Sequence, residues 1–209
     1  SLEIWRDGSV HQQTFERGKP TTDLLTTGVT QRRGTKVTFL PDATIFEITE
    51  YSFDTLAQRL RELAFLNAGI LITLDDERDG RQHRFQYDGG IISFVEHLNK
   101  NKAVLNERAI FMRGLKDGID AEIALQWNDS YTEQIFSFAN NINTHEGGTH
   151  LTGFRTALTR CINDYARAKG LLKEKDDNLE GNDTREGLTA IVSVKLREPQ
   201  FEEIGRAHV

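Results

Sequence analysis

The chain has 209 residues, of which 37% are hydrophobic and 28% are charged, and its formal net charge is −6. This length suffices for one large domain or two small ones, and the composition is that of a globular chain rather than a disordered one. The acidic balance excludes a protein whose whole surface binds nucleic acid, although it allows a local basic strip.

The sequence predicts a cytosolic protein. No run approaches 18 apolar residues, and the first residues lack the apolar stretch of a signal peptide. Cys161 is the only cysteine and therefore cannot form an internal disulfide. Its place in an amphipathic pattern favours a buried structural thiol over a reactive one.

The N-terminal quarter of the chain is predicted to form short strands. Residues 3–17 alternate weakly around Asp7-Gly8, which indicates two strands joined by a type I′ turn. Residues 18–33 are rich in Gly, Thr and Pro and predict a loop. A strand that contains Val37 follows this loop.

The next segment alternates helices and strands. Leucines spaced by four and three residues predict a helix over residues 54–69. Strands at 70–74 and 85–87 are predicted to pair across a tight turn, and a short helix follows at 92–98. The polar residues 99–102 mark the expected domain boundary.

The remaining residues predict a second sheet with one long helix. Strands are expected at 110–112, 119–127 and 134–138, followed by a helix at 151–165 and a final strand at 190–196. This order allows a right-handed crossover between parallel neighbours. Both halves of the chain are therefore predicted to be α+β, with mixed sheets that carry helices on one face.

The chain contains no self-sufficient catalytic motif. It has no phosphate loop, no dinucleotide-binding glycine motif, no H-E-x-x-H sequence and no paired cysteines. His145 and His150 flank Gly147-Gly148, and their spacing does not suit a metal site. The two glycines could bind an anion at the helix start, whereas the simpler interpretation is an entry turn with Thr149 as N-cap.

The long helix carries three arginines that could form a basic strip. Arg160 and Arg167 are seven residues apart and share one face, with Arg155 some distance around the helix. Such a strip can contact DNA phosphates without reading sequence, or it can be an ordinary polar face. The charged residues 173–183 that follow the helix predict a mobile loop.

Several motifs resemble the B subunits of type IIA topoisomerases. The transducer-domain signature of that family is similar to GGTHLTGFRTALTR at 147–160, REGLTAIVSVK at 185–195 and PQF at 199–201. The end of its ATPase domain is similar to LRELAFLN at 60–67 and YDGGI at 87–91. The motifs follow the family's order from about residue 3 to residue 202, and ALQWND at 124–129 resembles bacterial DNA gyrase more than topoisomerase IV.

The resemblance implies a fold for each part of the chain. Residues 1–102 would be the C-terminal part of a GHKL-type ATPase domain, and residues 103–202 would be part of a ribosomal-S5-like transducer domain. In that transducer the βαβ crossover is left-handed, in contrast to the generic expectation. Residues 203–209 are expected to be a non-native tail, because the family's Gln-Thr-Lys loop is absent; Arg206 is not assigned the role of its lysine.

The resemblance also implies the function of the parent protein, of which this chain would be an internal fragment. It would be an ATP-dependent DNA topoisomerase that couples ATP binding and hydrolysis to strand passage and negative supercoiling. Its cofactors would be ATP and Mg²⁺, and its partners would be the gyrase A subunit, DNA and a second B subunit in the bacterial cytoplasm. The alternatives are a topoisomerase IV B subunit and a stand-alone S5-like nucleic-acid-binding module.

Three residues match the rim of the family's ATP pocket. Arg6 matches a pocket-edge arginine that also contacts aminocoumarin inhibitors, Thr35 a threonine in the adenine network, and Val37 an apolar neighbour on the same strand. The family's catalytic glutamate and magnesium ligands have no counterpart here. We therefore assign no catalytic or metal-binding residue, and we expect this chain alone to bind no cofactor and to be inactive.

Overall fold

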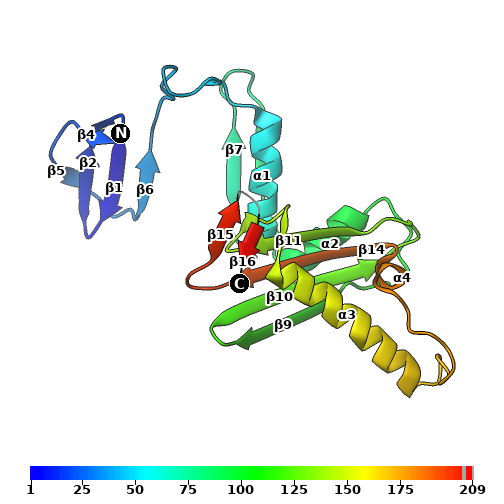
Figure 1. Ribbon diagram of the computed structural model, residues 1–209. Coiled ribbons are helices and arrows are strands. Elements are labelled where there is room, and N and C mark those ends of the chain that lie inside the picture. The colour runs from blue at the N-terminus through cyan, green and yellow to red at the C-terminus, as the bar shows by residue number, and fades with distance from the viewer. Residues whose placement is uncertain (204–205, 209) are drawn as a thin grey trace. The chain divides into compact units, whose positions relative to one another are not determined.

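The computed structural model describes residues 1–203 and 206–208, with side chains up to residue 201 (Figure 1). The chain forms two compact units, which we call unit 1 (Ser1–Ser52) and unit 2 (Phe53–Val209). Within the described part, no helix is long and apolar enough to cross a membrane.

Unit 1 is built from a four-stranded antiparallel sheet in the order β5-β2-β1-β6. Its strands are β1 (Leu2–Arg6), β2 (Ser9–Gln13), β5 (Leu25–Val29) and β6 (Gly34–Val37), and a small hairpin joins β3 (Phe15–Glu16) to β4 (Lys19–Pro20). Asp7 and Gly8 have φ angles of 52° and 80°, as a type I′ turn requires. The predicted hairpin between β1 and β2 is thus confirmed.

The prediction of a loop over residues 18–33 is wrong in part, because β5 lies within it. β5 pairs with β2 along Ser9–Gln12, with a bulge between Val10 and His11. The sequence of β5 includes Thr26, Thr27 and Val29, whose branched side chains suit a strand. The surrounding Gly, Thr and Pro residues concealed this short element.

Unit 2 contains all the helices of the described residues. Its elements are α1 (Phe53–Leu66), β7 (Ile72–Asp75), β8 (Gln82–Phe85), α2 (Gly90–Asn99), β9 (Ile110–Lys116), β10 (Ile119–Trp127), β11 (Gln134–Ala139), β12 (Ile142–Asn143), β13 (Gly147–Gly148), α3 (Thr149–Ala168), α4 (Gly181–Arg185), β14 (Leu188–Lys195), β15 (Gln200–Glu203) and β16 (Arg206–His208). The helices and most of the strands predicted from periodicity in this part of the chain are confirmed. The strand predicted at 85–87 lies earlier, at Gln82–Phe85.

The main sheet of unit 2 has the order β12-β11-β14-β10-β9. The last long strand, β14, lies between β11 and β10; it runs parallel to β11 and antiparallel to β10. The predicted parallel pairing across the long helix is confirmed, and the handedness of that crossover stays a prediction. β7 pairs with β8 in a separate hairpin, and β13, β16 and β15 form a small third sheet.

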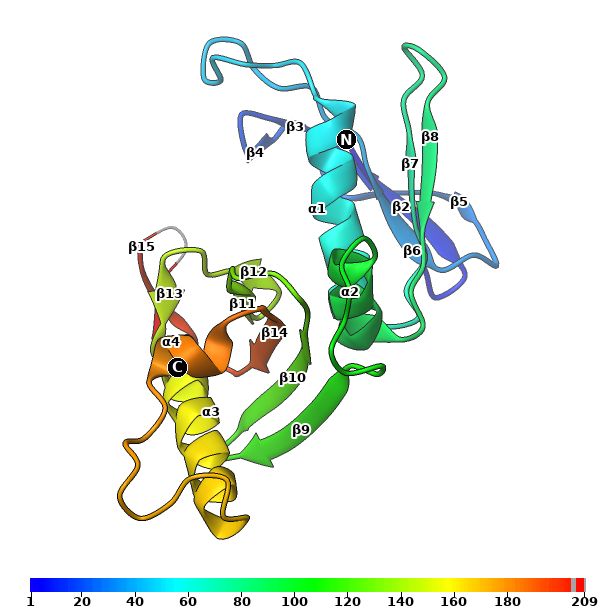
Figure 2. The same ribbon diagram turned by 90° about the vertical axis from the view of Figure 1, so that its right-hand side faces the viewer.

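Helices cover both faces of the main sheet, in contrast to the predicted single covered face (Figure 2). On one face Ala124, Phe138 and Ile191 pack against Phe65 of α1 and Phe94 of α2. On the other face Leu125, Ala190 and Val192 pack against Leu151 and Phe154 of α3. β14 is apolar on both sides, with Ile191 and Val192 adjacent in sequence, and it therefore requires cover on both.

The long helix α3 contacts the sheet through its first half only. Leu151 and Phe154 are buried, whereas Tyr165 is 60% exposed and Cys161 is also exposed. The prediction of a buried Cys161 is therefore wrong, because the amphipathic stripe continues beyond the part of the helix that the sheet covers. The helix cap also differs from the prediction: Gly148 is the N-cap and Thr149 is the first helical residue.

The expected domain boundary near residue 102 falls inside unit 2. Helices α1 and α2 pack on the main sheet and therefore belong to the same compact unit as that sheet, which begins after Ser52. A domain defined by descent need not coincide with a compact unit. The assignment of 1–102 and 103–202 to two family domains therefore stays a prediction.

Candidate functional site

The three residues expected at a nucleotide-pocket rim lie on one face of the unit 1 sheet. In the antiparallel pair of β1 and β6, Thr35 is opposite Ile4 and Val37 is opposite Leu2. Directly opposite residues point to the same face of a sheet, as do residues two apart on one strand. Arg6, two residues after Ile4, therefore shares a face with Thr35 and Val37.

This face is open to ligands. Arg6 ends β1 beside the turn, where its Nε donates to Asp7 Oδ2 at 3.2 Å, and both side chains are more than 70% exposed. Val37 is 64% exposed, and Thr35 is exposed as well. The face offers a cation, a hydroxyl and an apolar side chain, which can bind and orient an anionic ligand that carries an aromatic ring.

The residues present do not form a metal centre. No group of three His, Cys, Asp or Glu side chains within the described residues could hold a metal ion. The Nε2 of His150 is 3.1 Å from the hydroxyl of Thr144. Burial lowers the pKa of His150, so the neutral imidazole is favoured.

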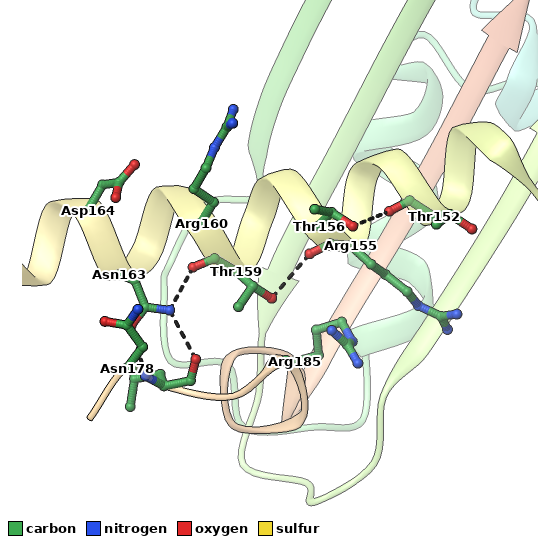
Figure 3. A pocket seen from close by; sticks show the side chains of 11 residues that line it. Thr152, Arg155, Thr156, Thr159, Arg160, Asn163, Asp164, Asn178 and Arg185 are labelled. Atoms are coloured by element: carbon green, nitrogen blue, oxygen red, sulfur yellow. Dashed lines mark hydrogen bonds between the residues drawn. The ribbon is translucent and has the colours of Figure 1, made fainter.

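Unit 2 holds a second candidate site, a polar groove of about 610 Å³ along α3 (Figure 3). We call it the arginine groove. It is lined by Thr152, Arg155, Thr156, Thr159, Arg160, Asn163, Asp164, Asn178, Leu179, Gly181 and Arg185. Three of these are arginines, whose N–H groups suit a phosphate. The threonine hydroxyls beside them already donate to carbonyl oxygens of Gly148, Thr152 and Arg155.

Two of the three arginines already have a carboxylate partner. Arg155 donates from Nε to Glu133 Oε1 at 3.0 Å, and its Nη2 donates to the same oxygen. Arg185 donates from Nε to Glu133 Oε2 at 2.7 Å. Burial raises the pKa of Glu133, but the hydrogen bonds from Arg185 and Arg155 outweigh it and the net pKa is lowered.

Arg160 is the exposed cation of the groove. Its guanidinium forms no hydrogen bond or ion pair with any described residue. In Figure 3 it points away from Arg155 and Arg185, whose guanidinium groups lie together at one end of the groove. Arg160 is therefore free to meet a phosphate without breaking an internal contact.

Arg167, expected on the same strip, does not line the groove. Its Nε donates to Asn178 Oδ1 at 2.9 Å, and its other nitrogens donate to the carbonyl oxygens of Lys173 and Asp176 at 3.0 and 2.9 Å. These bonds hold the first part of the segment that was predicted as a mobile loop. The end of that segment is not a loop, because α4 begins within it at Gly181, with Glu180 as N-cap. Sequence spacing identified the arginine face of α3, but it could not predict that Arg167 forms hydrogen bonds with this segment.

Arg185 is the groove residue that helical spacing did not identify. It belongs to α4, 30 positions after Arg155, and only the fold brings the two together. The signal available in the sequence was its position at the start of the REGLTA motif.

The chain is similar to known proteins along nearly its whole length. The family model described as DNA gyrase B matches residues 90–203. The gyrase B protein of Halalkalibacterium halodurans is 57% identical over 203 residues, which is 96% of this chain and 32% of that protein. The chain spans about a third to a half of the length of the first curated relatives that it matches.

Solved structures show the same fold. The 43K ATPase domain of Thermus thermophilus gyrase B, in complex with an aminocoumarin, superposes with a TM-score of 0.84 at 38% identity; the match covers 100% of this chain and 57% of that one. The ATP-binding domain of Francisella tularensis topoisomerase IV, in complex with a small-molecule inhibitor, has a TM-score of 0.80. Its 24% identity shows the fold alone; the match covers 99% of this chain and 57% of that one.

Proposed function

The chain belongs to the DNA gyrase B family, and on that basis we propose that it is part of the B subunit of an ATP-dependent type II DNA topoisomerase. The observation that carries this proposal is the family match over residues 90–203 together with 57% identity to a known gyrase B protein. The parent enzyme would couple ATP binding and hydrolysis to strand passage and negative supercoiling. Its partners would be the gyrase A subunit, DNA and a second B subunit, in the bacterial cytoplasm.

Topoisomerase IV is the second candidate. The match of the DNA gyrase B family model and the 57% identity to a gyrase B protein favour gyrase. Supercoiling separates the two. We expect the full-length protein that contains this sequence, reconstituted with its gyrase A partner, to introduce negative supercoils into relaxed plasmid when ATP is present. Relaxation or decatenation without supercoiling would contradict the gyrase assignment.

Within this enzyme, we propose that Arg6, Thr35 and Val37 form part of the rim of the ATP pocket. Their common open face supports the proposal, as does the aminocoumarin bound by the Thermus thermophilus relative. They can bind and orient a nucleotide but cannot activate water. The described residues include no group of three His, Cys, Asp or Glu side chains that could hold Mg²⁺.

The chain alone is expected to hydrolyse no ATP, because none of the rim side chains is a general base. A steady-state phosphate-release assay on the purified chain checks this expectation. A rate above that of buffer would contradict it. In the full-length protein, Arg6→Ala should weaken nucleotide or aminocoumarin binding while the melting temperature stays unchanged, since the ion pair of Arg6 with Asp7 is exposed.

We further propose that the arginine groove contacts the phosphate backbone of DNA through Arg160, with Arg155 and Arg185 beside it. Arg167 would support this surface by holding the neighbouring loop rather than by contacting DNA. Charge reversal tests the groove. Arg160→Glu should lower the affinity for a short duplex and reduce its salt dependence, whereas Arg84→Glu, the same change on β8, should have a smaller effect.

A stand-alone nucleic-acid-binding module is the remaining alternative for this chain. It predicts tight salt-dependent duplex binding without any effect of the parent's ATP cycle. In the gyrase proposal, duplex binding by the isolated chain is weak, and ATP strengthens DNA capture by the full-length protein. Measurement of the duplex affinity of the isolated chain and of the full-length protein, each with and without a non-hydrolysable ATP analogue, distinguishes the two proposals.

Finally, we propose that the boundary between the ATPase and transducer domains lies at Gly89-Gly90 rather than at residue 102. The family match, which begins at Gly90, favours this position. The end of α2 is also joined to that sheet by buried hydrogen bonds. Asn99 donates to Gln126 Oε1 at 2.9 Å and accepts from the Thr189 hydroxyl at 2.7 Å.

A further inference from the structure

Glu133 does not line the arginine groove, but it binds two of the groove's arginines as a phosphate would. Its two oxygens each face a different guanidinium, Oε1 toward Arg155 and Oε2 toward Arg185. The three side chains come from the segment before β11, from α3 and from α4. A carboxylate held between two arginines is an internal anion that neutralises two of the groove's three cations in part.

The hydrogen bonds to Glu133 use donors that a phosphate would need. Nε and Nη2 of Arg155 and Nε of Arg185 are engaged, and Nη2 of Arg185 also donates to Asn182 Oδ1 at 3.2 Å. Each arginine has five N–H donors, so each keeps some free. Glu133 therefore reduces the capacity of the groove for an external anion without abolishing it.

The two arginines differ in how easily they can leave Glu133. The side chain of Arg155 is 43% exposed, whereas that of Arg185 is 14% exposed and that of Glu133 is 25% exposed. Arg155 can turn toward solvent and keep its charge hydrated. Arg185 stays behind and continues to neutralise the half-buried carboxylate, so release of Arg155 leaves no unpaired buried charge.

We propose that Glu133 competes with DNA phosphate for Arg155. Glu133 binds Arg155 in the free chain, and a phosphate that lies next to one bound at Arg160 replaces Glu133 as the partner of Arg155. This inference rests on the proposed DNA contact of the groove and adds a residue that sets its affinity. Arg160 makes the first contact because it is free, and Arg155 makes the second by exchanging one anion for another. Arg185 keeps Glu133 in place throughout.

The exchange makes the groove weak toward isolated anions and stronger toward a polyanion. A single phosphate gains little by replacing a carboxylate that is already bound at no loss of translational freedom. A duplex presents neighbouring phosphates, so contact at Arg160 raises the local phosphate concentration at Arg155. The expected ligand is therefore a nucleic-acid backbone rather than free phosphate.

The test compares Glu133→Gln with Glu122→Gln in the complete 209-residue chain. Both changes remove one carboxylate charge; Glu122 lies on β10, is paired with Arg113 at 3.4 Å and is 23% exposed, close to the 25% of Glu133. The readout is fluorescence anisotropy of a labelled duplex of about 20 base pairs, long enough to span several phosphates, at a series of salt concentrations. Arg160→Glu and Arg84→Glu are measured in parallel.

Glu133→Gln should bind the duplex about fivefold more tightly than the unchanged chain at low salt, the scale of one partly exposed ion pair. Its affinity should also fall more steeply with salt, by about one additional released counterion. Glu122→Gln should show neither effect. An equal gain in both variants would mean that net charge alone is responsible, and an unchanged or weaker Glu133→Gln would mean that Glu133 positions Arg155; either result overturns the proposal.

A second variant covers a failure of Glu133→Gln to fold. Glu133→Asp keeps the charge but is too short to reach both arginines, so it should raise the affinity about twofold with no change in net charge. No gain in this variant also overturns the proposal. If Arg160→Glu weakens binding but neither Glu133 variant strengthens it, only the competitor role is lost. If Arg160→Glu and Arg84→Glu act alike, the groove itself does not contact DNA.

Discussion

Unit 1 and unit 2 belong to the same chain and have similar local strand patterns, but only unit 2 has a core. No residue of unit 1 is buried: the first buried side chain in the chain is Phe53. In unit 2, Phe65, Phe138 and Ile191 are at most 1% exposed. Strand pairing alone therefore gives the proposed nucleotide rim its shape, whereas packing on both faces of a sheet fixes the arginine groove.

This difference shows that paired strands alone do not stabilise a folded unit. In unit 1 the large apolar side chains of Val29, Leu40 and Ile48 are more than 80% exposed. Apolar burial is the main favourable term in folding, at about 25 cal/mol for each Å² removed from water. Unit 1 lacks this term within the described structure, and the following predictions test how far the contrast extends.

The largest expected effect is in amide hydrogen exchange. Amides of β1, β2 and β6 should exchange with an opening free energy near zero, because their ladder has no packed side chains above it. Amides of β10 and β14 should approach the global stability, about 5–15 kcal/mol for a domain. Hydrogen exchange followed by mass spectrometry on proteolytic fragments measures the protection of both sheets. Equal protection in the two sheets would contradict the expected difference between the units.

The next effect is the cost of deleting the same side chain in each unit. Phe138→Ala removes a fully buried ring from the main core and should lower the free energy of unfolding by about 3–5 kcal/mol. Phe39→Ala removes a ring that is 70% exposed and should change it by less than about 0.5 kcal/mol. Urea denaturation followed by fluorescence compares the two, and similar losses would show a core in unit 1.

A smaller effect is expected from a backbone position that only glycine suits. Gly187 has a φ angle of +69°, and a Cβ there would lie 2.3 Å from the carbonyl oxygen of Asn128. Gly187→Ala should therefore cost about 2–3 kcal/mol. Gly153→Ala is the matched control, because its Cβ would meet nothing within 4 Å and alanine favours the helix; it should be neutral or stabilising in the same urea titration.

The smallest predicted effect is the pH dependence that the partly buried imidazole of His150 and the more exposed imidazole of His97 give to unit 2. Burial lowers the pKa of His150 from its ordinary value of 6.5, and burial, with Arg61 and Lys100 nearby, lowers that of His97. The neutral forms are favoured in the folded state. Their contribution to stability is present above pH 6.5 and is lost as the pH falls through the lowered folded values.

His150→Gln should flatten this part of the pH profile. Thermal melts between about pH 7.5 and about pH 5 cover the range in which histidine titrates, with His83→Gln, a change at an exposed residue of β8, as the control. A melting temperature that falls equally in His150→Gln and in the unchanged chain would contradict the assignment to His150.

Much of the fold could be predicted because it depends on neighbours in the sequence. The helical spacing of leucines gave α1, and the alternation from Ile119 to Trp127 gave β10. Short elements without a clear period were missed; β5 became visible only through its pairing with β2. The prediction of burial was also wrong where a helix extends beyond the sheet that covers it, as at Cys161 on α3.

The sequence by itself determined the family, the order of the elements and the candidate rim residues, since motifs and periodicities are local. The tertiary structure decided which faces are covered and which arginines meet. Glu133 lies 22 positions from Arg155 and 52 from Arg185. Helix and strand periodicity cannot predict contacts between residues so far apart in the sequence. Long-range packing brings such residues together, because burial and charge pairing depend on three-dimensional neighbours rather than on spacing in the sequence.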